Sequence, residues 1–592
     1  MRHLGGRVDE TVQNEIKKTI IMYHNSSPVK TSRINRLIKL ILIFLLFVAQ
    51  TIEAAIINVS TISALQTAAN ASLAGDIIIL ANGVYTNNTL TIANSNITVQ
   101  SATAGGVYLN GTNAISISSN YITFSGFRFT SGTILGNVIT VSGNYNTLTQ
   151  LDFNNYNAAH MVYISGSHNI LSSSNFQNKP APNLVNHGGT GDMVQIIPSP
   201  TIIGYNVIRY CSFQHMPGFG GDYGNECIRI GDGAYSADVS RTVVEYCYFE
   251  DTGNGDSESI SVKSKQNCIR FNTSNNNPNA MFSFRNGNDN VAYSNFFIKS
   301  GGIRCKEANN IYCYNNYFEE SAKGQNTSLP GTGKAPIYFE YFGAGYGNNF
   351  NIINNTFYRC TPSQIDTGMI NCTWANNVIY SDSATIFTGS TNGQSFAGNI
   401  YQGAIGLTIT SGMNNINPLL TLNSSNYYGL SVISPAINAS STSYPTLLAI
   451  SGIGDDSTMA YDIQGQPRPA SIPLKDAGCD EYTIGIITNS PLALCDVGPS
   501  YLCTTTGISS NKDIEQNNIT LYPNPSNGVF KITSQTTISF IEIMNLQGEM
   551  IYRTQIKTDK AEVDLHNFSK GIYFVRIIDI NKNVTNKKTT IQ

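Results

Sequence analysis

The sequence has few charged residues and no excess of either sign. Charged residues make up 12% of its 592 residues, about half of the roughly 25% typical of soluble domains. The 35 Lys and Arg residues against 38 Asp and Glu leave a formal net charge of −3, so the basic excess of a general nucleic-acid binder is missing. Extensive disorder is excluded as well, because 41% of the residues are hydrophobic and 10% are aromatic.

Metal-binding patterns and long apolar runs are also missing. The 11 Cys residues form no CxxC pairs and the seven His residues show no HxxxH or HxH spacing, which argues against a zinc site or a His-based metal site. The apolar run Leu40–Ala49 is about half of the roughly 20 residues that a membrane span needs. It follows a basic stretch and precedes two alanines, so residues 1–54 are predicted to be a signal peptide with a long n-region, leaving a mature chain without a transmembrane span.

Small polar residues and tyrosine take the place of charge, with 51 Gly and 32 Tyr. Such residues favour a long β architecture with many turns. A short phrase that ends in an apolar residue recurs between residues 55 and 485, at intervals that cluster at 21–25 residues. Longer intervals of 36–39 residues fit one repeat with an inserted loop. The equivalent positions are Leu151, Ser174, Cys211, Cys247, Asn272, Asn295, Asn316, Asn355 and Asn377.

Self-similarity at this period predicts a solenoid, and alternation of apolar and polar residues between turns predicts strands. The resulting hypothesis for residues 55–485 is an all-β parallel β-helix, in which equivalent residues of successive coils stack in columns. A buried column of Asn would be satisfied by hydrogen bonds along the axis. Cys211 and Cys247 would fill the same column as small apolar side chains without a disulfide.

The chain changes character near residue 485. Residues 486–514 are rich in Pro, Gly, Thr and Asn without periodicity and are predicted to be a linker, in which Cys495 and Cys503 could close a small disulfide loop. Residues 515–592 contain three alternating runs around Gly and Pro turns, which predict a small C-terminal β-sandwich.

Three strings in this last region resemble the C-terminal sorting domain of the type IX secretion system: YPNP from Tyr522, NLQG from Asn545 and GIYFV from Gly571. The resemblance implies that the type IX secretion machinery is a partner. It further implies export through the outer membrane of a Bacteroidota-type bacterium, to give a secreted or surface-attached protein.

The densest cluster of polar residues surrounds the string ISVKS. Alternation along this strand and along MFSFR places Lys263 and Arg285 on the outward face. They are 22 residues apart, which is one coil, and adjacent coils lie about 4.8 Å apart. Asp256 and Glu258 precede the first strand in a Gly-rich turn. Strand parity would put Glu258 on the side opposite Lys263, so a corner must intervene for the carboxylates to join the same site.

These residues resemble the pattern of polysaccharide lyase family 6, which includes alginate lyases and chondroitinase B. The family has an acidic-x-acidic pair before S-x-K-S and an R-H-G one coil later, and the resemblance covers about residues 55–485. It implies a right-handed, pectin-lyase-like β-helix in which Lys263 and Arg285 are catalytic. It also implies Ca²⁺ held by Asp256 and Glu258.

The sequence departs from the family pattern at three points. The first acid is Asp256 where Glu is usual. The family's third calcium ligand, an Asn, aligns with Tyr223, so Asn225 or Glu226 would have to substitute. The His after the catalytic Arg is Asn286 here, a candidate for positioning substrate. Further candidates for binding an acidic substrate are a set of possible groove residues, namely Arg229, Arg270, Arg304, Tyr338 and Glu340.

The chemistry of these residue types fits a lyase. A base removes the proton at C5 of a uronate, the C4–O bond breaks, and a hard cation or an Arg neutralises the charge that develops. Lys263 can be the base only as the neutral amine, which nearby cations favour, and Arg285 would protonate the leaving oxygen. The leading hypothesis is a Ca²⁺-assisted lyase for an anionic uronate polysaccharide, namely alginate. Alternatives are a chondroitin or dermatan sulfate lyase and a non-catalytic glycan-binding surface β-helix.

Overall fold

The structure is a computed structural model of the chain. It describes residues 54–180, 191–216, 225–253, 258–326, 334–340, 347–366, 368–454, 456–483, 487–503, 519–545, 550–580 and 584–591. Apart from residue 54, the predicted signal peptide lies outside the described residues. Among the helices described, none is long and apolar enough to cross a membrane.

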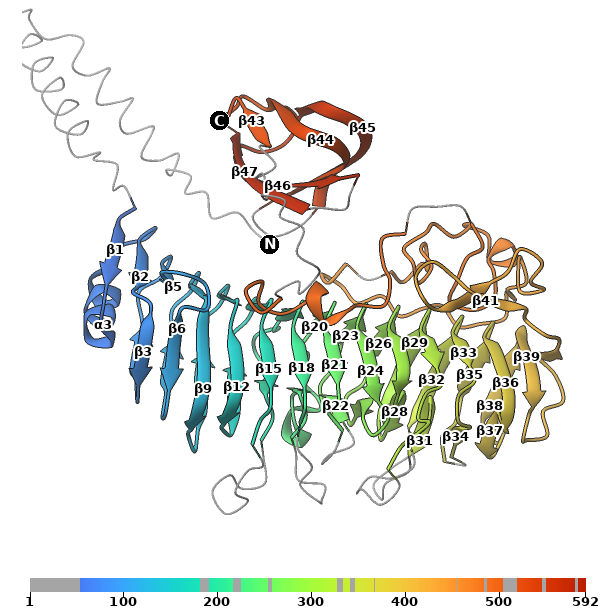
Figure 1. Cartoon of the computed structure of the whole chain (residues 1–592). Helices are drawn as coiled ribbons and strands as arrows, with labels where there is room; N and C mark the ends of the chain where they lie inside the picture. The colour runs from blue at the N-terminus through green and yellow to red at the C-terminus, as the bar shows by residue number, and fades with distance from the viewer. Residues whose placement is uncertain are drawn as a thin grey trace, which may run out of the picture. The chain divides into compact units, whose positions relative to one another are not determined.

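Most of the described chain forms a solenoid of three parallel sheets, which we name A, B and C (Figure 1). Each coil adds one strand to each sheet along most of its length, so the predicted all-β parallel β-helix is confirmed. Sheet A contains β1 (Ile56–Val59), β2 (Ile77–Leu80), β5 (Thr98–Ser101), β8 (Thr123–Ser125), β11 (Thr147–Thr149), β14 (Ile170–Ser172), β17 (Val207–Arg209), β20 (Val243–Glu245), β23 (Cys268–Arg270), β26 (Asn290–Tyr293), β29 (Asn309–Tyr314), β32 (Asn348–Ile353), β35 (Cys372–Ala375) and β38 (Gln394–Ala397). Sheet B contains β3 (Gly83–Thr86), β6 (Val107–Asn110), β9 (Phe127–Thr133), β12 (Asp152–Asn157), β15 (Asn175–Gln177), β18 (Ser212–Gln214), β21 (Tyr248–Glu250), β24 (Thr273–Asn277), β27 (Phe296–Ser300), β30 (Tyr317–Glu319), β33 (Thr356–Tyr358), β36 (Val378–Thr385), β39 (Asn399–Ala404) and β40 (Met413–Asn415). Sheet C contains β4 (Thr89–Ile92), β7 (Ala114–Ile117), β10 (Asn137–Val141), β13 (His160–Ile164), β16 (Val194–Ile196), β19 (Ile228–Ile230), β22 (Glu258–Val262), β25 (Met281–Arg285), β28 (Ile303–Lys306), β31 (Ile337–Glu340), β34 (Ser363–Ile365) and β37 (Phe387–Gly389).

A short helix covers the N-terminal end of the solenoid. Helix α3 (Ile62–Ala71) begins after Thr61, whose hydroxyl oxygen accepts a hydrogen bond from the Ala64 N–H at 3.1 Å. Its buried residues Leu65 and Ala69 join the core of the coils. Such a cap shields the core that the first coil would otherwise leave open to water.

The interior of the solenoid is built from stacked columns, as the repeat predicts. In sheet B, five phenylalanines on consecutive strands stack with ring-centroid distances of 4.5, 5.0, 4.9 and 5.1 Å. Offset stacking of this kind adds to the burial energy of aromatic rings. The column consists of Phe129, Phe153, Phe176, Phe213 and Phe249.

A ladder of buried amides runs along the turn between sheets A and B. The side-chain oxygen of each member accepts hydrogen bonds from the backbone N–H and the side-chain NH₂ of the member before it, at 2.8–3.1 Å. The predicted Asn column is therefore confirmed, and it continues one rung further than the sequence repeat indicated. Its members are Asn272, Asn295, Asn316, Asn355, Asn377 and Asn399.

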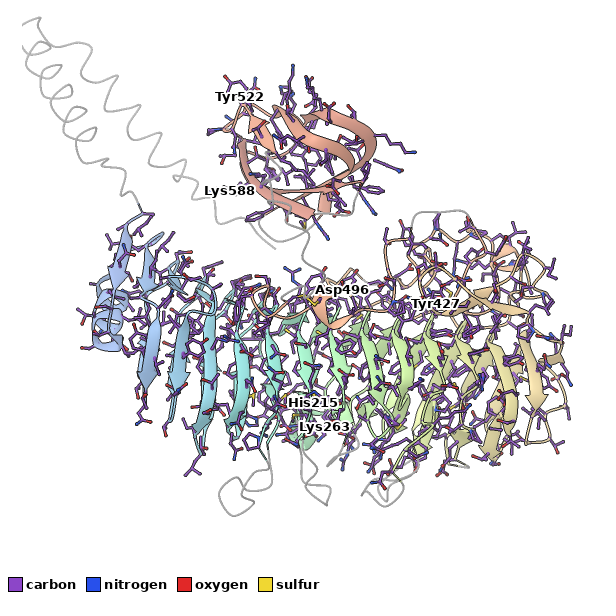
Figure 2. All side chains as sticks on the ribbon, viewed as in Figure 1. His215, Lys263, Tyr427, Asp496, Tyr522 and Lys588 are labelled. Atoms are coloured by element: carbon purple, nitrogen blue, oxygen red, sulfur yellow. A yellow bond between two sulfur atoms is a disulfide. The ribbon has the colours of Figure 1, made fainter. Side chains whose placement is uncertain are left out.

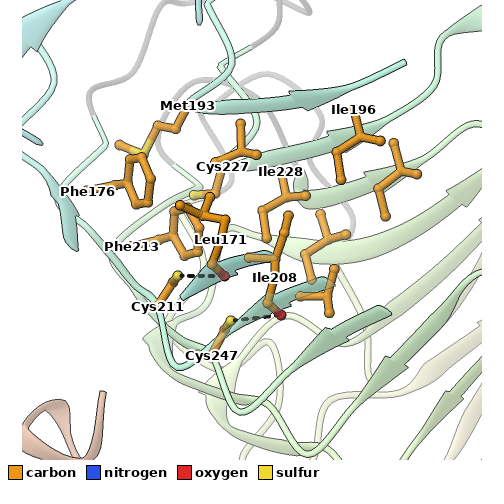
Figure 3. Close-up of a cluster of buried hydrophobic side chains, with 14 of the residues drawn as sticks. Leu171, Phe176, Met193, Ile196, Ile208, Cys211, Phe213, Cys227, Ile228 and Cys247 are labelled. Carbon is orange, nitrogen blue, oxygen red and sulfur yellow. Dashed lines mark hydrogen bonds between the residues drawn. The ribbon is translucent and has the colours of Figure 1, made fainter. Parts of the chain in front are cut away.

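Cysteine takes the place of asparagine in two earlier coils of the same column, as predicted. The thiols of Cys211 and Cys247 are buried and unpaired, and they contact the carbonyl oxygens of Leu171 and Ile208 at 3.8 Å (Figure 3). The Cys247 N–H donates to the Asn272 side-chain oxygen at 2.9 Å, which places the thiols at the head of the ladder. A small apolar side chain thus fills the slot that an amide fills in later coils.

The chain after the last coil returns along the solenoid. It includes the hairpin of β41 (Leu420–Leu422) and β42 (Tyr428–Leu430) and the short 3₁₀ helices η2 (Ile472–Leu474) and η3 (Leu494–Asp496), while another short helix, η1 (Gly233–Tyr235), lies within a coil. The buried Arg468 anchors this segment: its guanidinium donates to the Asn315 side chain at 2.9 Å. Tyr427 and Asp496, which mark the segment, lie on the side of the solenoid opposite Lys263 (Figure 2).

The predicted linker is shorter than its composition indicated. Residues 487–503 pack on the solenoid: the Leu492 N–H donates to Thr273 at 2.8 Å, and the Tyr501 ring faces the Arg128 guanidinium at 5.2 Å. The predicted disulfide between Cys495 and Cys503 is formed. The two compact units of the chain divide after Cys503, so the structure extends the β-helix unit beyond the predicted boundary at 485. The sequence of residues 487–503 resembled a linker because this segment does not follow the repeat of the coils.

The C-terminal unit is a small antiparallel β domain. Its strands are β43 (Thr520–Tyr522), β44 (Val529–Met544), β45 (Met550–Asp564), β46 (Gly571–Asp579) and β47 (Val584–Ile591). The long strand β44 pairs with β43, β45 and β46, and β46 pairs with β47, so hydrogen bonds connect all five strands, as expected for the predicted small β domain. Buried side chains such as Phe530, Ile541 and Val575 form its core.

Candidate active site on the outer face of sheet C

Two columns of outward side chains run across the middle coils of sheet C. The first column stands at the centre of the strands and the second at their C-terminal ends. Lys263 directly follows Val262, which is paired with Phe284, so Lys263 stands opposite Arg285 on the next coil, as predicted. The first column is Arg229, Ser261, Ser283, Arg304 and Tyr338, and the second is Lys263, Arg285, Lys306 and Glu340.

Five cations are therefore concentrated on four successive coils, β19, β22, β25 and β28. We call Arg229, Lys263, Arg285, Arg304 and Lys306 the cation row. The side chains of Arg229 and Lys263 are 13% and 12% exposed, so their charges lie partly out of water. A concentration of partly buried charge of one sign attracts an anionic polymer and binds its acidic groups.

Glu258 reaches this face through an irregularity in its strand. The pairing of β22 with β25 shifts register between Glu258 and Ile260, which supplies the corner that strand parity required. The Glu258 side chain is fully buried and forms an ion pair with Arg304. The Nε of Arg304 also donates to the Ser283 hydroxyl oxygen at 2.9 Å. Arg304 is thus fixed beneath the surface by groups from two neighbouring coils.

Lys263 is paired with Glu226 from the preceding coil. Its Nζ lies 3.4 Å from Glu226 Oε1, and the Glu226 side chain is 2% exposed. Burial disfavours the Glu226 carboxylate, but a hydrogen bond from Asp192 and the cations Lys263 and Arg229 outweigh it and lower its pKa. Burial and the neighbouring Glu226 raise the pKa of Asp192 well above its usual value.

Asp192 also orients Arg229. The Nε of Arg229 lies 2.9 Å from Asp192 Oδ2 and donates to Gln195 Oε1 at 2.5 Å. His160 stands 3.8 Å from the same carboxyl oxygen, and burial, together with the cations nearby, lowers its pKa to about 4. His160 is therefore neutral at physiological pH and adds no positive charge beside Asp192 and Arg229.

The calcium ligands expected from the family resemblance stand in different settings. Glu226 Oε2 and Glu258 Oε2 are buried and receive no hydrogen bond from described residues, whereas Glu258 Oε1 is paired with Arg304. The Asn225 side-chain oxygen instead accepts a hydrogen bond from the buried Lys179 ammonium at 3.0 Å, which does not suit a cation ligand. Asp256 lies outside the described residues. Within the described ranges, no group of three or more His, Cys, Asp or Glu side chains is placed to hold one ion.

Three other candidate residues stand in different settings. Arg270 is on β23 of sheet A, where it donates to Glu245 and to the Tyr293 hydroxyl, both at 2.9 Å. The structure therefore does not bring Arg270 to the cation row, because this coil turns between β22 and β23. Asn286 follows β25 directly, and its side-chain NH₂ donates to Glu307 at 3.0 Å. Tyr338 stands beside Arg304 in the first column.

Several groups at this site were not found from the sequence. Lys179 and Asp192 lie on either side of an insertion in the sequence repeat, so no repeat position marked them. Gln195 had a usable signal, since it occupies the centre of VQI (194–196) as Arg229 does in IRI (228–230), one coil later. His160 begins a strand that carries no other charged residue, and nothing in its neighbourhood indicated a role.

A comparison with protein families identifies the chain. The family model described as chondroitinase B matches residues 59–369, more than half of the chain, and the chain belongs to this family of polysaccharide lyases. A second model, a secretion-system C-terminal sorting domain, matches residues 520–592 and marks the chain for type IX export through the outer membrane. No curated protein sequence shows a significant match to the chain.

Solved structures of lyases share the solenoid at low identity. The alginate lyase AlyGC of polysaccharide lyase family 6 is 23% identical with a TM-score of 0.56, and the match covers 66% of this chain and 59% of AlyGC. A mannuronic-acid-specific family 6 lyase from human gut microbiota is 20% identical with a TM-score of 0.50, over 61% of this chain and 91% of that one. The alginate lyase AlyF-OU02 is 16% identical with a TM-score of 0.51, over 65% and 92%. These likenesses establish the fold.

Proposed function

We propose that the chain cleaves a uronate-containing polysaccharide by β-elimination, with alginate as its substrate. The observation that carries this proposal is the placement of Lys263 and Arg285 on adjacent coils of one outward column, within a row of five cations. Membership of a lyase family supports the reaction type. The alginate lyases among the similar structures support the substrate.

In the proposed reaction, the cation row binds the carboxylates of the polymer. The Lys263 amine takes the proton from C5, the electron pair of the C5–H bond forms the C4–C5 double bond, and the C4–O bond breaks. The leaving oxygen takes a proton from Arg285, which stays protonated between turnovers. Arg229 would stabilise the negative charge that develops on the carboxylate next to C5. Lys263 is competent only after its ammonium has lost a proton, so contact with Glu226 must loosen before turnover.

Calcium is a second part of this proposal. Glu226 and Glu258, together with Asp256, would hold the ion, which when bound supplies positive charge for neutralising the substrate carboxylate. Chelation should then remove most activity and added Ca²⁺ should restore it, with Glu258→Ala unresponsive to the metal. Full activity in excess chelator would mean that a basic side chain such as Arg229 neutralises the carboxylate without calcium.

Dermatan or chondroitin sulfate is the second candidate substrate, and the observation in its favour is the chondroitinase B description of the matching family model. The two substrates differ in sulfate groups, which need additional cations. The cation row is confined to four coils, and the first column beyond it continues with Tyr338, Gln364 and Thr388, which are uncharged. This limited supply of cations favours a polymer that carries carboxylates alone.

The test is to incubate the mature chain with alginate, polymannuronate, chondroitin sulfate and dermatan sulfate and to follow the absorbance of the unsaturated product. Lys263→Ala and Arg285→Ala should each abolish elimination. Matched controls on or directly after sheet B strands, Lys299→Ala and Arg359→Ala, should retain elimination and melt near the wild type. Lys263→Ala also removes a cation from the buried Glu226, so calorimetry must show that this variant is folded before its loss of activity is interpreted. Normal turnover by Lys263→Ala or Arg285→Ala would refute the assignment of these residues. The absence of unsaturated product from every polymer would favour the glycan-binding alternative.

A further inference from the structure

A carboxylate stands at one end of the cation row. Glu340, the last residue of β31, places Oε2 3.1 Å from Arg304 Nη1 and Oε1 3.3 Å from Lys306 Nζ. Its side chain is 23% exposed, whereas those of Arg304 and Lys306 are 6% and 5% exposed. Glu340 is thus the solvent-side partner of two cations that lie beneath it.

This bridge uses the contacts that an acidic sugar would need. A uronate carboxylate that bound at the same coil would direct its two oxygens to the same guanidinium and ammonium groups. Glu340 and such a sugar cannot both occupy these positions, because two carboxylates so close together repel each other. No described residue in the first column of the next two coils provides a replacement cation, since Gln364 and Thr388 are uncharged.

We propose that Glu340 is a specificity-determining residue, which occupies Arg304 and Lys306 with its own carboxylate and so ends the binding of acidic sugars at strand β28. This inference rests on the proposed function, because it concerns how many units of the acidic polymer the cation row accepts. A sugar unit that lies over β31 gains nothing from a negative charge, and the enzyme should therefore not distinguish oligouronates that extend past this strand from those that end before it.

A simpler role for Glu340 is to neutralise the cations of the row. Burial lowers the pKa of Lys306, Glu340 opposes that shift, and Arg285 and Arg304 add to it. If neutralisation were its whole role, the loss of the Glu340 charge would lower stability and leave the dependence on substrate length unchanged. The two roles therefore differ in a measurable property other than activity.

The experiment compares wild type, Glu340→Gln and a matched control, Asp382→Asn. Asp382 pairs with Arg359 at 2.7 Å on the opposite sheet B, so its replacement also removes one carboxylate charge but leaves sheet C intact. The Kd of size-fractionated oligouronates is measured by calorimetry at low temperature and at early times, with an ionic-strength series. Values of kcat/KM are measured for the same fractions.

The Kd of Glu340→Gln for oligomers long enough to reach β31 should fall about tenfold, as expected when one like charge is removed at a partly buried contact. The Kd for shorter oligomers should not change, and Asp382→Asn should match the wild type. Glu340→Asp keeps the charge, so its Kd should depend on oligomer length as in the wild type. If Glu340→Gln folds poorly, Glu340→Ala should show the same gain in affinity for long oligomers. If Kd depends on oligomer length in the same way for the wild type and the uncharged variants, the inference is overturned, whether or not the wild type cleaves the oligomers. A length-dependent gain in binding without elimination by the wild type overturns only the proposed function.

Discussion

The ion pair between Arg304 and Glu258 permits a quantitative prediction. In Arg304→Gln the fully buried Glu258 loses its positive partner. Loss of one partner of a buried pair typically costs about 3–5 kcal/mol, because the remaining charge is left uncompensated. Glu258 can limit this cost by taking a proton. Holding a carboxyl of ordinary pKa about 4.3 neutral at pH 7 costs about 3.7 kcal/mol, so the expected loss is close to 3–4 kcal/mol.

The predicted change in melting temperature follows from the size of the solenoid unit. Residues 54–503 are about 450 residues, and unfolding entropy of about 2.1 cal/mol/K per residue gives about 0.95 kcal/mol/K for a cooperative transition. A loss of 3–4 kcal/mol therefore lowers Tm by about 3–4 °C at pH 7. In the variant the folded-state pKa of Glu258 is raised above its unfolded value, so the deficit should grow as pH rises from about 4 and shrink as pH falls towards it.

The assay is differential scanning calorimetry of wild type, Arg304→Gln and Arg359→Gln across this pH range. Arg359 pairs with Asp382 at the surface, where both side chains are at least one-third exposed, so its replacement should not shift Tm measurably. If Glu258 is also a calcium ligand, added Ca²⁺ should raise the Tm of Arg304→Gln more than that of the wild type. A Tm for Arg304→Gln equal to that of Arg359→Gln at pH 7 would refute the electrostatic reasoning.

Three further predictions concern the rest of the fold. Asn316→Ala removes a rung that accepts from Asn295 and donates to Asn355, so it should cost about 1–3 kcal/mol for each buried group left unpaired; a calorimetric Tm near that of the wild type would mean that the ladder contributes little. The pKa of His160 is lowered to about 4 in the folded state, against about 6.5 in the unfolded chain. The stability that the neutral form contributes is therefore present above pH 6.5 and is lost, by about 3 kcal/mol, as pH falls to 4. His160→Gln should make Tm depend less on pH over this interval, and an unchanged slope of Tm against pH would contradict burial as the cause. A chain that ends after Cys503 should melt at the same temperature as the solenoid unit of the full-length chain. A chain that ends at residue 485 should melt at a lower temperature and be cleaved more readily by protease, because it lacks the contacts of residues 487–503. Equal melting temperatures of the two chains would support the prediction that residues 486–514 are a linker.

The repeat, the Asn column and the outward placement of Lys263 and Arg285 were predictable from the sequence. All three depend on periodicity. The length of a coil and the alternation along a strand can be read from the local sequence, and parallel stacking makes neighbours of residues at equivalent positions in successive coils. The same reasoning made Cys211 and Cys247 members of the Asn column without a disulfide. Motif resemblance, a separate kind of evidence, indicated the lyase family and the sorting domain.

Only the tertiary structure decided which charged groups meet. Asp192 and Lys179 lie close to Glu226 and Asn225, although an insertion in the sequence separates them from the repeat positions. A β-bulge, which strand parity cannot place, brings Glu258 to Arg304. Residues 487–503 lack a repeat partner and still pack on sheet B, because side-chain contacts hold them there. Periodicity fixes the position of a residue on its coil, but ion pairing is set by distances of a few ångströms between side chains from different coils, and the fold determines these distances.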